Sequence, residues 1–263
     1  MENQIWSLTQ GVGPVVATAI HSGHEVREEL KGLLAVSEED RFREEDPFTG
    51  PWTEAVSTQV VVTRSRFEVD LNRPRERAVY FNPEDAWGLQ VWKKNPTADV
   101  IAKSLAEYDA FYAQMRKIFS ELKRQFGYFV VFDLHSYNHL RDGPDGPPAN
   151  LELNPEVNIG TGTLNRGRFG LLVDRFMQDI RRFDYLGSTL DIRENVKFEG
   201  GHFSEWAHRE FPDSACVLAV EFKKFFMDEW TGIPDPIQLG AIKRALESTV
   251  PGVLEELKKL YQT

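Results

Sequence analysis

Cysteine is almost absent from this sequence, because Cys216 is the single one in 263 residues. An intrachain disulfide is therefore impossible, and a metal site built from several cysteines is excluded. A reducing compartment suits such a chain, and we expect it in the cytoplasm. Residues 1–6 lack the basic start and the apolar run of a secretory signal peptide. No stretch approaches the ~18 consecutive apolar residues of a transmembrane helix, so we expect no membrane partner.

Positive charge is also in short supply. The chain has 31 basic and 41 acidic side chains, which give a formal net charge of −10. This balance argues against nucleic acid or an anionic membrane as the main partner. Internal repeats, low-complexity tracts and Ser/Gly linkers are absent as well. The length lies within the range of one α/β domain, and we therefore predict a single domain over residues 1–263.

Short apolar runs alternate with helical patterns along the chain. Runs that are typical of strands covered on both faces lie at 15–21, 59–65, 128–134, 189–193 and 215–222. Helical patterns lie at 24–34, 98–126, 167–183 and 236–260. Pro251 should break the last of these helices in two. The alternation predicts an α/β fold in which helices cover both sides of a mostly parallel sheet.

Two of the expected strands end in histidine. The run from residue 15 leads into His21, and the run from residue 128 leads into His135. Imidazole nitrogen is a favoured ligand of zinc, and a catalytic zinc ion takes three protein ligands and keeps one position for water. Two histidines at strand ends therefore suggest one metal site at the edge of the sheet. The candidates for the third ligand are Asp46, Glu45 and His24.

Two buried carboxylates have both a catalytic and a structural interpretation. Asp133 lies two residues before His135, so in a strand both side chains point to the same face. Its carboxylate could orient an imidazole or cap a nearby helix. Glu221 lies within an apolar run, where a carboxylate is expensive to bury unless it is paired or has a raised pKa. It is therefore either a general base or the partner of a nearby lysine or arginine.

Residues 63–74 bring several polar side chains together just beyond a strand. Arg66, Asn72 and Arg73 belong to this segment. An arginine beside an asparagine amide suits an amino-acid-like anionic ligand, although a surface salt-bridge network would give the same pattern. The chain has neither the His-Glu-x-x-His signature nor a Gly-x-Gly-x-x-Gly phosphate loop after its first predicted strand.

Taken in order, these motifs resemble the N-formylglutamate amidohydrolase family and, more distantly, the zinc carboxypeptidases and the aspartoacylase/succinylglutamate desuccinylase group. The resemblance covers roughly residues 15–232. It rests on the segments His21-Ser22-Gly23, Arg43-Glu44-Glu45-Asp46-Pro47-Phe48-Thr49, Ser65-Arg66, Asp70-Leu71-Asn72-Arg73, Asp133-Leu134-His135-Ser136-Tyr137, Gly200-Gly201-His202 and Val220-Glu221-Phe222-Lys223.

The resemblance implies a three-layer α/β/α fold with a mixed, mostly parallel sheet of the phosphorylase/hydrolase-like, zinc-carboxypeptidase-like type. It also implies a metal-dependent hydrolase with one Zn²⁺ per chain. The expected ligands are His21, Asp46 and His135. The distant relatives have a His-x-x-Glu pattern, and His24 occupies the glutamate position here. We therefore choose Asp46 as the third ligand.

The resemblance assigns roles to further residues. Glu221 resembles the catalytic glutamate, and Arg66 resembles the arginine that polarises the scissile carbonyl. Asn72 and Arg73 resemble the pair that binds the substrate carboxylates, and His202 is a further candidate contact.

The implied reaction is hydrolysis of the amide of an N-acyl amino acid, with N-formyl-L-glutamate as the leading candidate for this small anionic substrate. The products would be formate and L-glutamate. The alternatives are an amidase or carboxypeptidase-type hydrolase for another acylated amino acid or short peptide, and a non-catalytic binding protein for an anionic metabolite.

Overall fold

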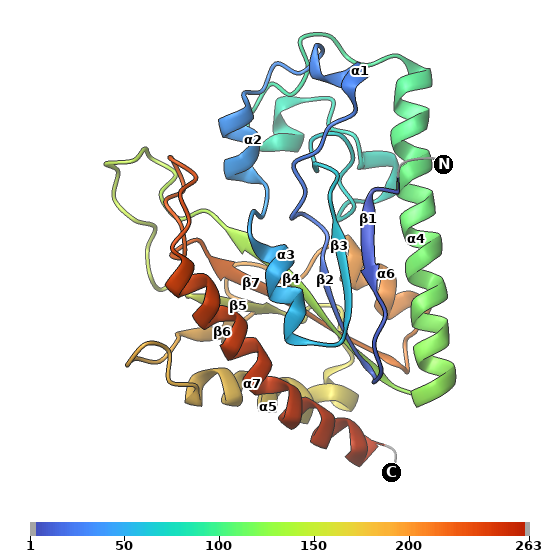
Figure 1. Ribbon diagram of the computed structural model, residues 1–263, viewed down its shortest axis with the longest axis vertical. Coiled ribbons are helices and arrows are strands. Elements are labelled where there is room, and N and C mark those ends of the chain that lie inside the picture. Colours follow the sequence, from blue (N-terminus) through green and yellow to red (C-terminus); the bar gives the residue numbers. More distant parts are fainter. Residues whose placement is uncertain (1–3, 261–263) are drawn as a thin grey trace.

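A seven-stranded sheet forms the centre of the computed structural model, which describes residues 4–260 (Figure 1). The strand order is β1-β3-β2-β4-β7-β5-β6. The strands are β1 (Trp6–Thr9), β2 (Val15–Ala19), β3 (Thr58–Val62), β4 (Phe129–Tyr137), β5 (Val157–Gly160), β6 (Ile192–Glu194) and β7 (Ala215–Lys223). Strand β2 runs parallel to β3 and β4, β4 to β7, and β5 to β6. The β1–β3 and β5–β7 pairs are antiparallel, so the sheet is mixed and mostly parallel, as predicted.

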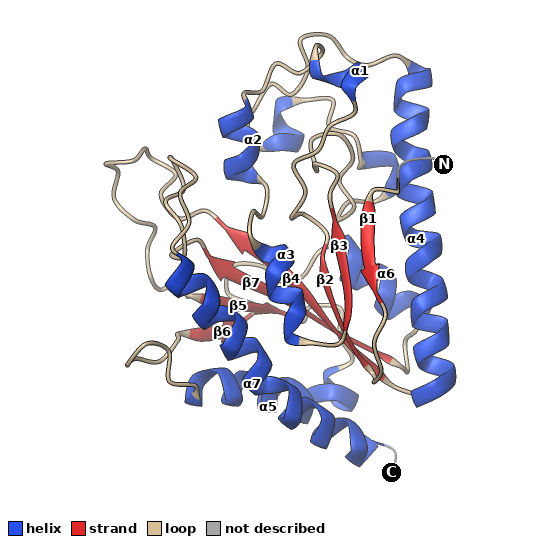
Figure 2. Cartoon of the chain, viewed as in Figure 1, coloured by secondary structure: helices blue, strands red, loops and turns tan. Residues whose placement is uncertain are grey.

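Helices cover both faces of the sheet (Figure 2). The α-helices are α1 (Glu28–Lys31), α2 (Glu38–Glu44), α3 (Thr49–Trp52), α4 (Ala98–Phe126), α5 (Arg166–Arg182), α6 (His202–Glu210) and α7 (Pro236–Leu260). Short 3-10 helices are η1 (Thr53–Ala55), η2 (Arg75–Arg77) and η3 (Pro83–Ala86). Helices α4 and α6 pack on one face, and α3, α5 and α7 pack on the other. The expected α/β fold with helices on both sides is confirmed.

Alternation along the central strands explains both the two cores and the site. On β4, Phe129 and Val131 belong to the core under α4 and α6. Asp133 and His135 follow on the same face, because successive side chains of a strand alternate between faces. Glu221 of β7 is the register partner of His135. One face of the sheet therefore changes from apolar to polar toward the carboxyl ends of β4 and β7, where ligands bind in open α/β sheets.

Two expectations about helices were wrong. In the expected helix 24–34, only α1 is helical. The backbone of Glu25 instead bonds to Thr63 and Ser65 beyond β3, which holds this segment in an extended conformation. Helix α7 runs unbroken through Pro251. Pro251 and Glu247, whose carbonyl loses its usual partner, both lie on the exposed side of α7, where water can bind that carbonyl.

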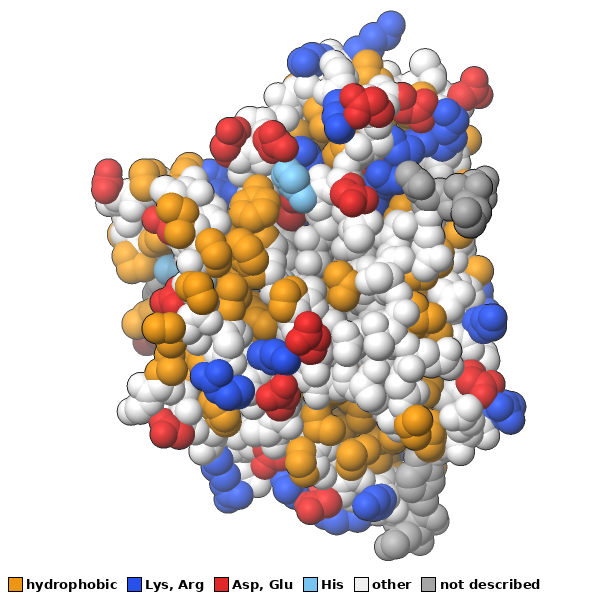
Figure 3. All heavy atoms as spheres, in the orientation of Figure 1, with side chains coloured by type: hydrophobic (Ala, Val, Ile, Leu, Met, Phe, Trp, Pro, Cys, Tyr) orange, Lys and Arg blue, Asp and Glu red, His pale blue; other side chains and the backbone are white. Residues whose placement is uncertain are grey.

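The molecular surface carries charges of both signs. Figure 3 shows acidic and basic side chains interspersed over one face, and hydrophobic side chains gathered beside the start of α7. Among residues 4–260, each helix is too short or too polar to cross a lipid bilayer.

Candidate active site

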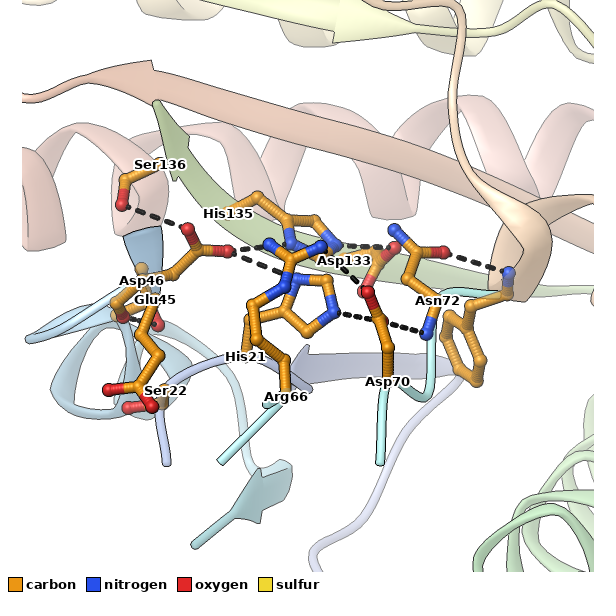
Figure 4. A network of polar contacts seen from close by, with 12 residues as sticks. His21, Ser22, Glu45, Asp46, Arg66, Asp70, Asn72, Asp133, His135 and Ser136 are labelled. Carbon is orange, nitrogen blue, oxygen red and sulfur yellow. Dashed lines mark hydrogen bonds and ion pairs between the residues drawn. The ribbon is translucent and has the colours of Figure 1, made fainter. Parts of the chain in front are cut away.

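His21, Asp46 and His135 converge at the carboxyl edge of the sheet (Figure 4). His21 follows β2, Asp46 follows α2, and His135 lies in β4. Each side chain offers a ligand atom, and these atoms lie within 4.8 Å of one another. Within the described residues 4–260 this is the one group of three or more such side chains with that spacing. The Oδ2 atom of Asp46 lies 2.9 Å from Nδ1 of His135 and 3.4 Å from Nδ1 of His21.

A separate carboxylate lies beside the second nitrogen of each imidazole. Nε2 of His21 is 2.7 Å from Oδ1 of Asp70, and Nε2 of His135 is 3.0 Å from Oδ2 of Asp133. Metal-binding histidines usually donate their second N–H to a carboxylate, carbonyl or water, which fixes the tautomer and the ring orientation. The arrangement therefore leaves both Nδ1 atoms facing Asp46.

The charges in this cluster depend strongly on one another. Burial by itself would raise the pKa of Asp46, but its hydrogen bonds to His135 and His21 lower that pKa below its ordinary value. Burial would likewise lower the pKa of His135, but the charge of Asp133 beside it raises that pKa well above the usual range. The pKa of Asp70 is well below normal because Arg66 and His21 outweigh its burial. Asp46 and Asp70 are thus ionised near neutral pH.

The two alternative third ligands are engaged with each other. Nδ1 of His24 lies 2.5 Å from Oε2 of Glu45. The other oxygen of Glu45 accepts a hydrogen bond from Ser65. The carboxylate of Asp46, in contrast, faces both histidines, and Ser136 donates to its second oxygen at 3.3 Å. Of the three candidates, the structure brings Asp46 to His21 and His135.

Glu221 lies beside the cluster as the register partner of His135. Glu221 is half-buried and lines a cavity. Desolvation raises the pKa of Glu221 to about 8, and the charges of Asp46 and Asp133 add to this effect, against His135 and Arg66. A carboxyl group with a raised pKa inside a cavity is typical of a general acid or base.

Arg66 also lies beside the cluster and lines the same cavity (Figure 4). Its Nη2 donates to Oδ2 of Asp70 at 2.8 Å, and its Nε donates to the hydroxyl of Tyr80 at 3.2 Å. The indole ring of Trp87 stacks against its guanidinium, 4.7 Å from the ring centre. These three contacts hold the charge of Arg66 in a defined place at the cavity wall.

Asn72 and Arg73 follow Asp70 directly. The side-chain oxygen of Asn72 accepts a hydrogen bond of 3.0 Å from the backbone N–H of Phe203 at the start of α6. Nη2 of Arg73 donates to the carbonyl of Asp85 at 3.0 Å, and its Nε is 3.8 Å from Asp70. Each of these side chains also lines the cavity, where it can meet an anion.

The cavity has a volume of about 370 Å³. Its lining includes the predicted site residues His21, Asp46, Arg66, Asn72, Arg73, His135 and Glu221. His202 is not part of that lining and lies beside Tyr112, with ring centres 5.9 Å apart, so its position gives no support to a role in substrate contact. A larger groove of about 1000 Å³ lies beside His24 and Arg41, away from Glu221.

Sequence reasoning missed several residues that line the cavity. They are Glu44, Trp87, Ser136, Asn138, Arg141, Phe198 and Lys224. Lys224 directly follows β7, three residues after Glu221. Its position at the carboxyl end of a strand could have identified it as a candidate cavity residue. Trp87 and Arg141 lie in irregular segments after η3 and β4, and the path of such segments cannot be read from periodicity.

A sequence model of the N-formylglutamate amidohydrolase family matches residues 13–226. The chain also shares its fold with an N-formylglutamate amidohydrolase from Ralstonia eutropha JMP134, with a TM-score of 0.77 and 16% identity over 97% of this chain and 99% of that one. A gene product from Agrobacterium tumefaciens has a TM-score of 0.66 and 17% identity over 96% and 97% of the two chains. No curated protein gives a significant match.

The matched region is most of the chain and contains every residue of the cluster, Glu221 and the Arg66–Arg73 segment. The predicted family is therefore confirmed. The chain belongs to the N-formylglutamate amidohydrolase family, whose members are hydrolases of amide bonds.

Proposed function

We propose that this protein hydrolyses N-formyl-L-glutamate to formate and L-glutamate with the help of one zinc ion. Family membership supports the reaction class. The observation that carries the proposal is the convergence of His21, Asp46 and His135 beside Glu221 in one cavity. A binding protein has no need of such a combination, whereas a hydrolase of this type needs both a metal and a base.

The chemistry of the cluster fits a zinc ion. Two imidazole nitrogens and one carboxylate oxygen are the ligand set of many catalytic zinc sites. The carboxylates of Asp70 and Asp133 lie beside the second nitrogens of the two imidazoles, as outer partners of zinc ligands commonly do. When bound, zinc would supply a Lewis acid that lowers the pKa of a water molecule to about 7.

Glu221 would move the proton in this reaction. One oxygen of its carboxylate takes a proton from the attacking water. The same oxygen then delivers this proton to the nitrogen of the leaving amine. The oxygen of that water forms a bond to the formyl carbon and the C–N bond of the formamide breaks, so the products are formate and the free amino group of L-glutamate. Arg66 would stabilise the negative charge that develops on the carbonyl oxygen, because its guanidinium is already held at the cavity wall.

Asn72 and Arg73 would bind the carboxylates of the substrate's glutamate half. Arg66 and Arg73 together carry two positive charges, and Asp70 compensates one of them. The remaining positive charge makes this end of the cavity attractive to an anion despite the negative charge of the whole chain.

Formate release from N-formyl-L-glutamate by the purified, zinc-loaded protein tests the proposal. A panel of other N-acyl amino acids and formylated dipeptides separates it from an amidase or peptidase of different specificity. We expect N-formyl-L-glutamate to have the highest kcat/KM. Absence of turnover on the whole panel would refute the proposal.

The variant Glu221→Gln isolates the proton transfer. The amide has nearly the shape of the carboxyl group but cannot accept the proton, and we expect kcat to fall by at least about 100-fold. Zinc content, measured by atomic absorption, should match the wild type. A variant that retains near-normal kcat would mean that another residue is the base.

A further inference from the structure

Figure 4 shows Asn72 on one side of the imidazoles of His21 and His135, and Asp46 and Ser136 on the other. All five residues line the cavity, so we treat these two sides as its two ends. The first end is the one that the proposed function assigns to the amino-acid half of the substrate. We call the second end the acyl end and define it by Glu44, Arg141 and Lys224, which line the same cavity.

A bidentate ion pair lines the acyl end. Nη1 and Nη2 of Arg141 each donate to one oxygen of Glu44, both at 3.1 Å. The side chain of Glu44 is only 4% exposed. A carboxylate buried to this degree requires a cationic partner, because leaving it uncompensated costs several kcal/mol. The pair is therefore part of the cavity wall, although the guanidinium of Arg141 is half-exposed.

Hydrogen bonds to Glu229 and Trp230 hold the loop that carries Arg141 in place. The buried carboxylate of Glu229 accepts the backbone N–H of His139 at 2.6 Å and that of Leu140 at 3.1 Å. The indole of Trp230 donates to the carbonyl of Leu140 at 2.9 Å. These bonds fix the backbone immediately before Arg141, so the guanidinium meets Glu44 in a defined position.

Lys224 adds a positive charge to the acyl end. It is 1% exposed, and its Nζ donates to the backbone carbonyls of Arg43 and, at 2.7 Å, of Glu45. These two bonds hold the segment that leads into Asp46. Since an ammonium group has three N–H donors, one remains for another acceptor at the cavity wall.

We propose that the Glu44–Arg141 pair limits the acyl group that this enzyme accepts. This inference rests on the proposed function, because the glutamate half is placed at Asn72 and Arg73. The acyl half then points toward Asp46, Glu44 and Arg141. A formyl group carries only hydrogen beyond its carbonyl carbon and needs no space there. A longer acyl chain meets the ion pair, and an anionic one meets the carboxylate of Glu44.

Two substitutions test separately whether the ion pair limits the size of the acyl group and its charge. Arg141→Ala removes the guanidinium side chain from the acyl end. We therefore expect the kcat/KM of N-acetyl- and N-propionyl-L-glutamate to rise about tenfold relative to that of N-formyl-L-glutamate. Glu44→Gln removes the negative charge of the acyl end, so the positive charges of Arg141 and Lys224 there are no longer offset by Glu44. We expect that variant to favour N-succinyl-L-glutamate, whose acyl chain ends in a carboxylate, by a similar factor.

Arg124→Ala is the matched control. Arg124 forms a comparable ion pair with Glu121 on the exposed last turns of α4, and its loss should leave all substrate ratios unchanged. Zinc content and circular dichroism verify that each variant is loaded and folded. Calorimetric binding of N-succinyl-L-glutamate in the Glu221→Gln background gives a second measurement that needs no turnover.

The outcomes distinguish this inference from the proposed function. If the wild type releases formate but both variants keep wild-type substrate ratios, the ion pair does not limit the acyl group. If either variant raises KM equally for every substrate, the pair binds the glutamate half and the inference is overturned. A wild type without activity on any acylated glutamate refutes the proposed function itself.

Discussion

At the scale of single residues, neighbouring acids have different surroundings. Asp46 and Glu45 are adjacent, and both are buried. The backbone N–H of Asp46 donates to the carbonyl of His21 at 3.0 Å, which brings its side chain to the two imidazoles. Glu45 points toward His24 and Ser65 instead. One step along the backbone therefore separates a candidate metal ligand from a carboxylate that joins two loops.

Substitution of each acid tests this difference. We expect Asp46→Asn to weaken zinc binding by more than 100-fold, because loss of even an outer partner of a zinc ligand costs about 10- to 100-fold. The matched Glu45→Gln should change zinc affinity by less than about tenfold. Competition with a chromophoric chelator measures both. Equal losses in the two variants would reassign the third ligand.

Only some of the site residues could be proposed from the sequence alone. His21 and His135 could be proposed because each follows an apolar run that ends at the sheet edge. Residue pattern alone did not separate Asp46 from Glu45 or His24, because only tertiary contacts orient that segment, and Asp46 was chosen only once the family resemblance had been considered. Arg141 could not be proposed either, since its loop is positioned by Glu229, nearly ninety residues later in the chain.

At the scale of secondary-structure elements, burial on both faces made the central strands predictable. Strands β2, β3, β4, β6 and β7 overlap the predicted runs, and α4 has the predicted bounds. Strand β5 was missed because it is short and contains Asn158, whose amide supports the 196–198 loop. The edge strand β1 was missed because only alternate residues are half-buried. The hydrophobic pattern therefore does not predict short elements whose polar residues make tertiary contacts.

The junction between Asn72 and helix α6 offers a test at this scale. A Cβ atom at Gly201 would lie 2.3 Å from the side-chain amide of Asn72. Gly201→Ala must therefore displace Asn72 and disturb its bond to Phe203. We expect KM for N-formyl-L-glutamate to rise roughly tenfold, equivalent to the loss of about one polar contact, with unchanged zinc content.

Gly32→Ala is a suitable control for that substitution. Gly32 has an ordinary φ of −69°, and a Cβ atom there meets nothing within 4 Å. Steady-state kinetics of both variants give the comparison. An unchanged KM in Gly201→Ala would show that Asn72 does not contact the substrate.

At the scale of the whole molecule, the cluster joins three segments that are far apart in the chain. His21 follows β2, Asp46 precedes α3, and His135 lies near the carboxyl end of the central strand β4. The carboxylates of Asp46, Asp70 and Asp133 are concentrated around them. A divalent cation would offset this negative charge and connect the three segments, so metal binding should stabilise the fold as well as serve the reaction.

Chelation tests this coupling without measuring activity. A ligand that binds only the native state adds about 4 kcal/mol to the free energy of unfolding when its concentration is 1,000 times its Kd. For a chain of this size, each kcal/mol shifts Tm by about 2–4 °C. Removal of zinc should thus lower Tm by roughly 10 °C in differential scanning calorimetry, and zinc, unlike magnesium, should restore it. The Asp46→Asn variant, which lacks one proposed ligand, should show a much smaller Tm change in both treatments. If the chelator removes zinc from the wild type but does not change its Tm, the native cluster is stable without a cation.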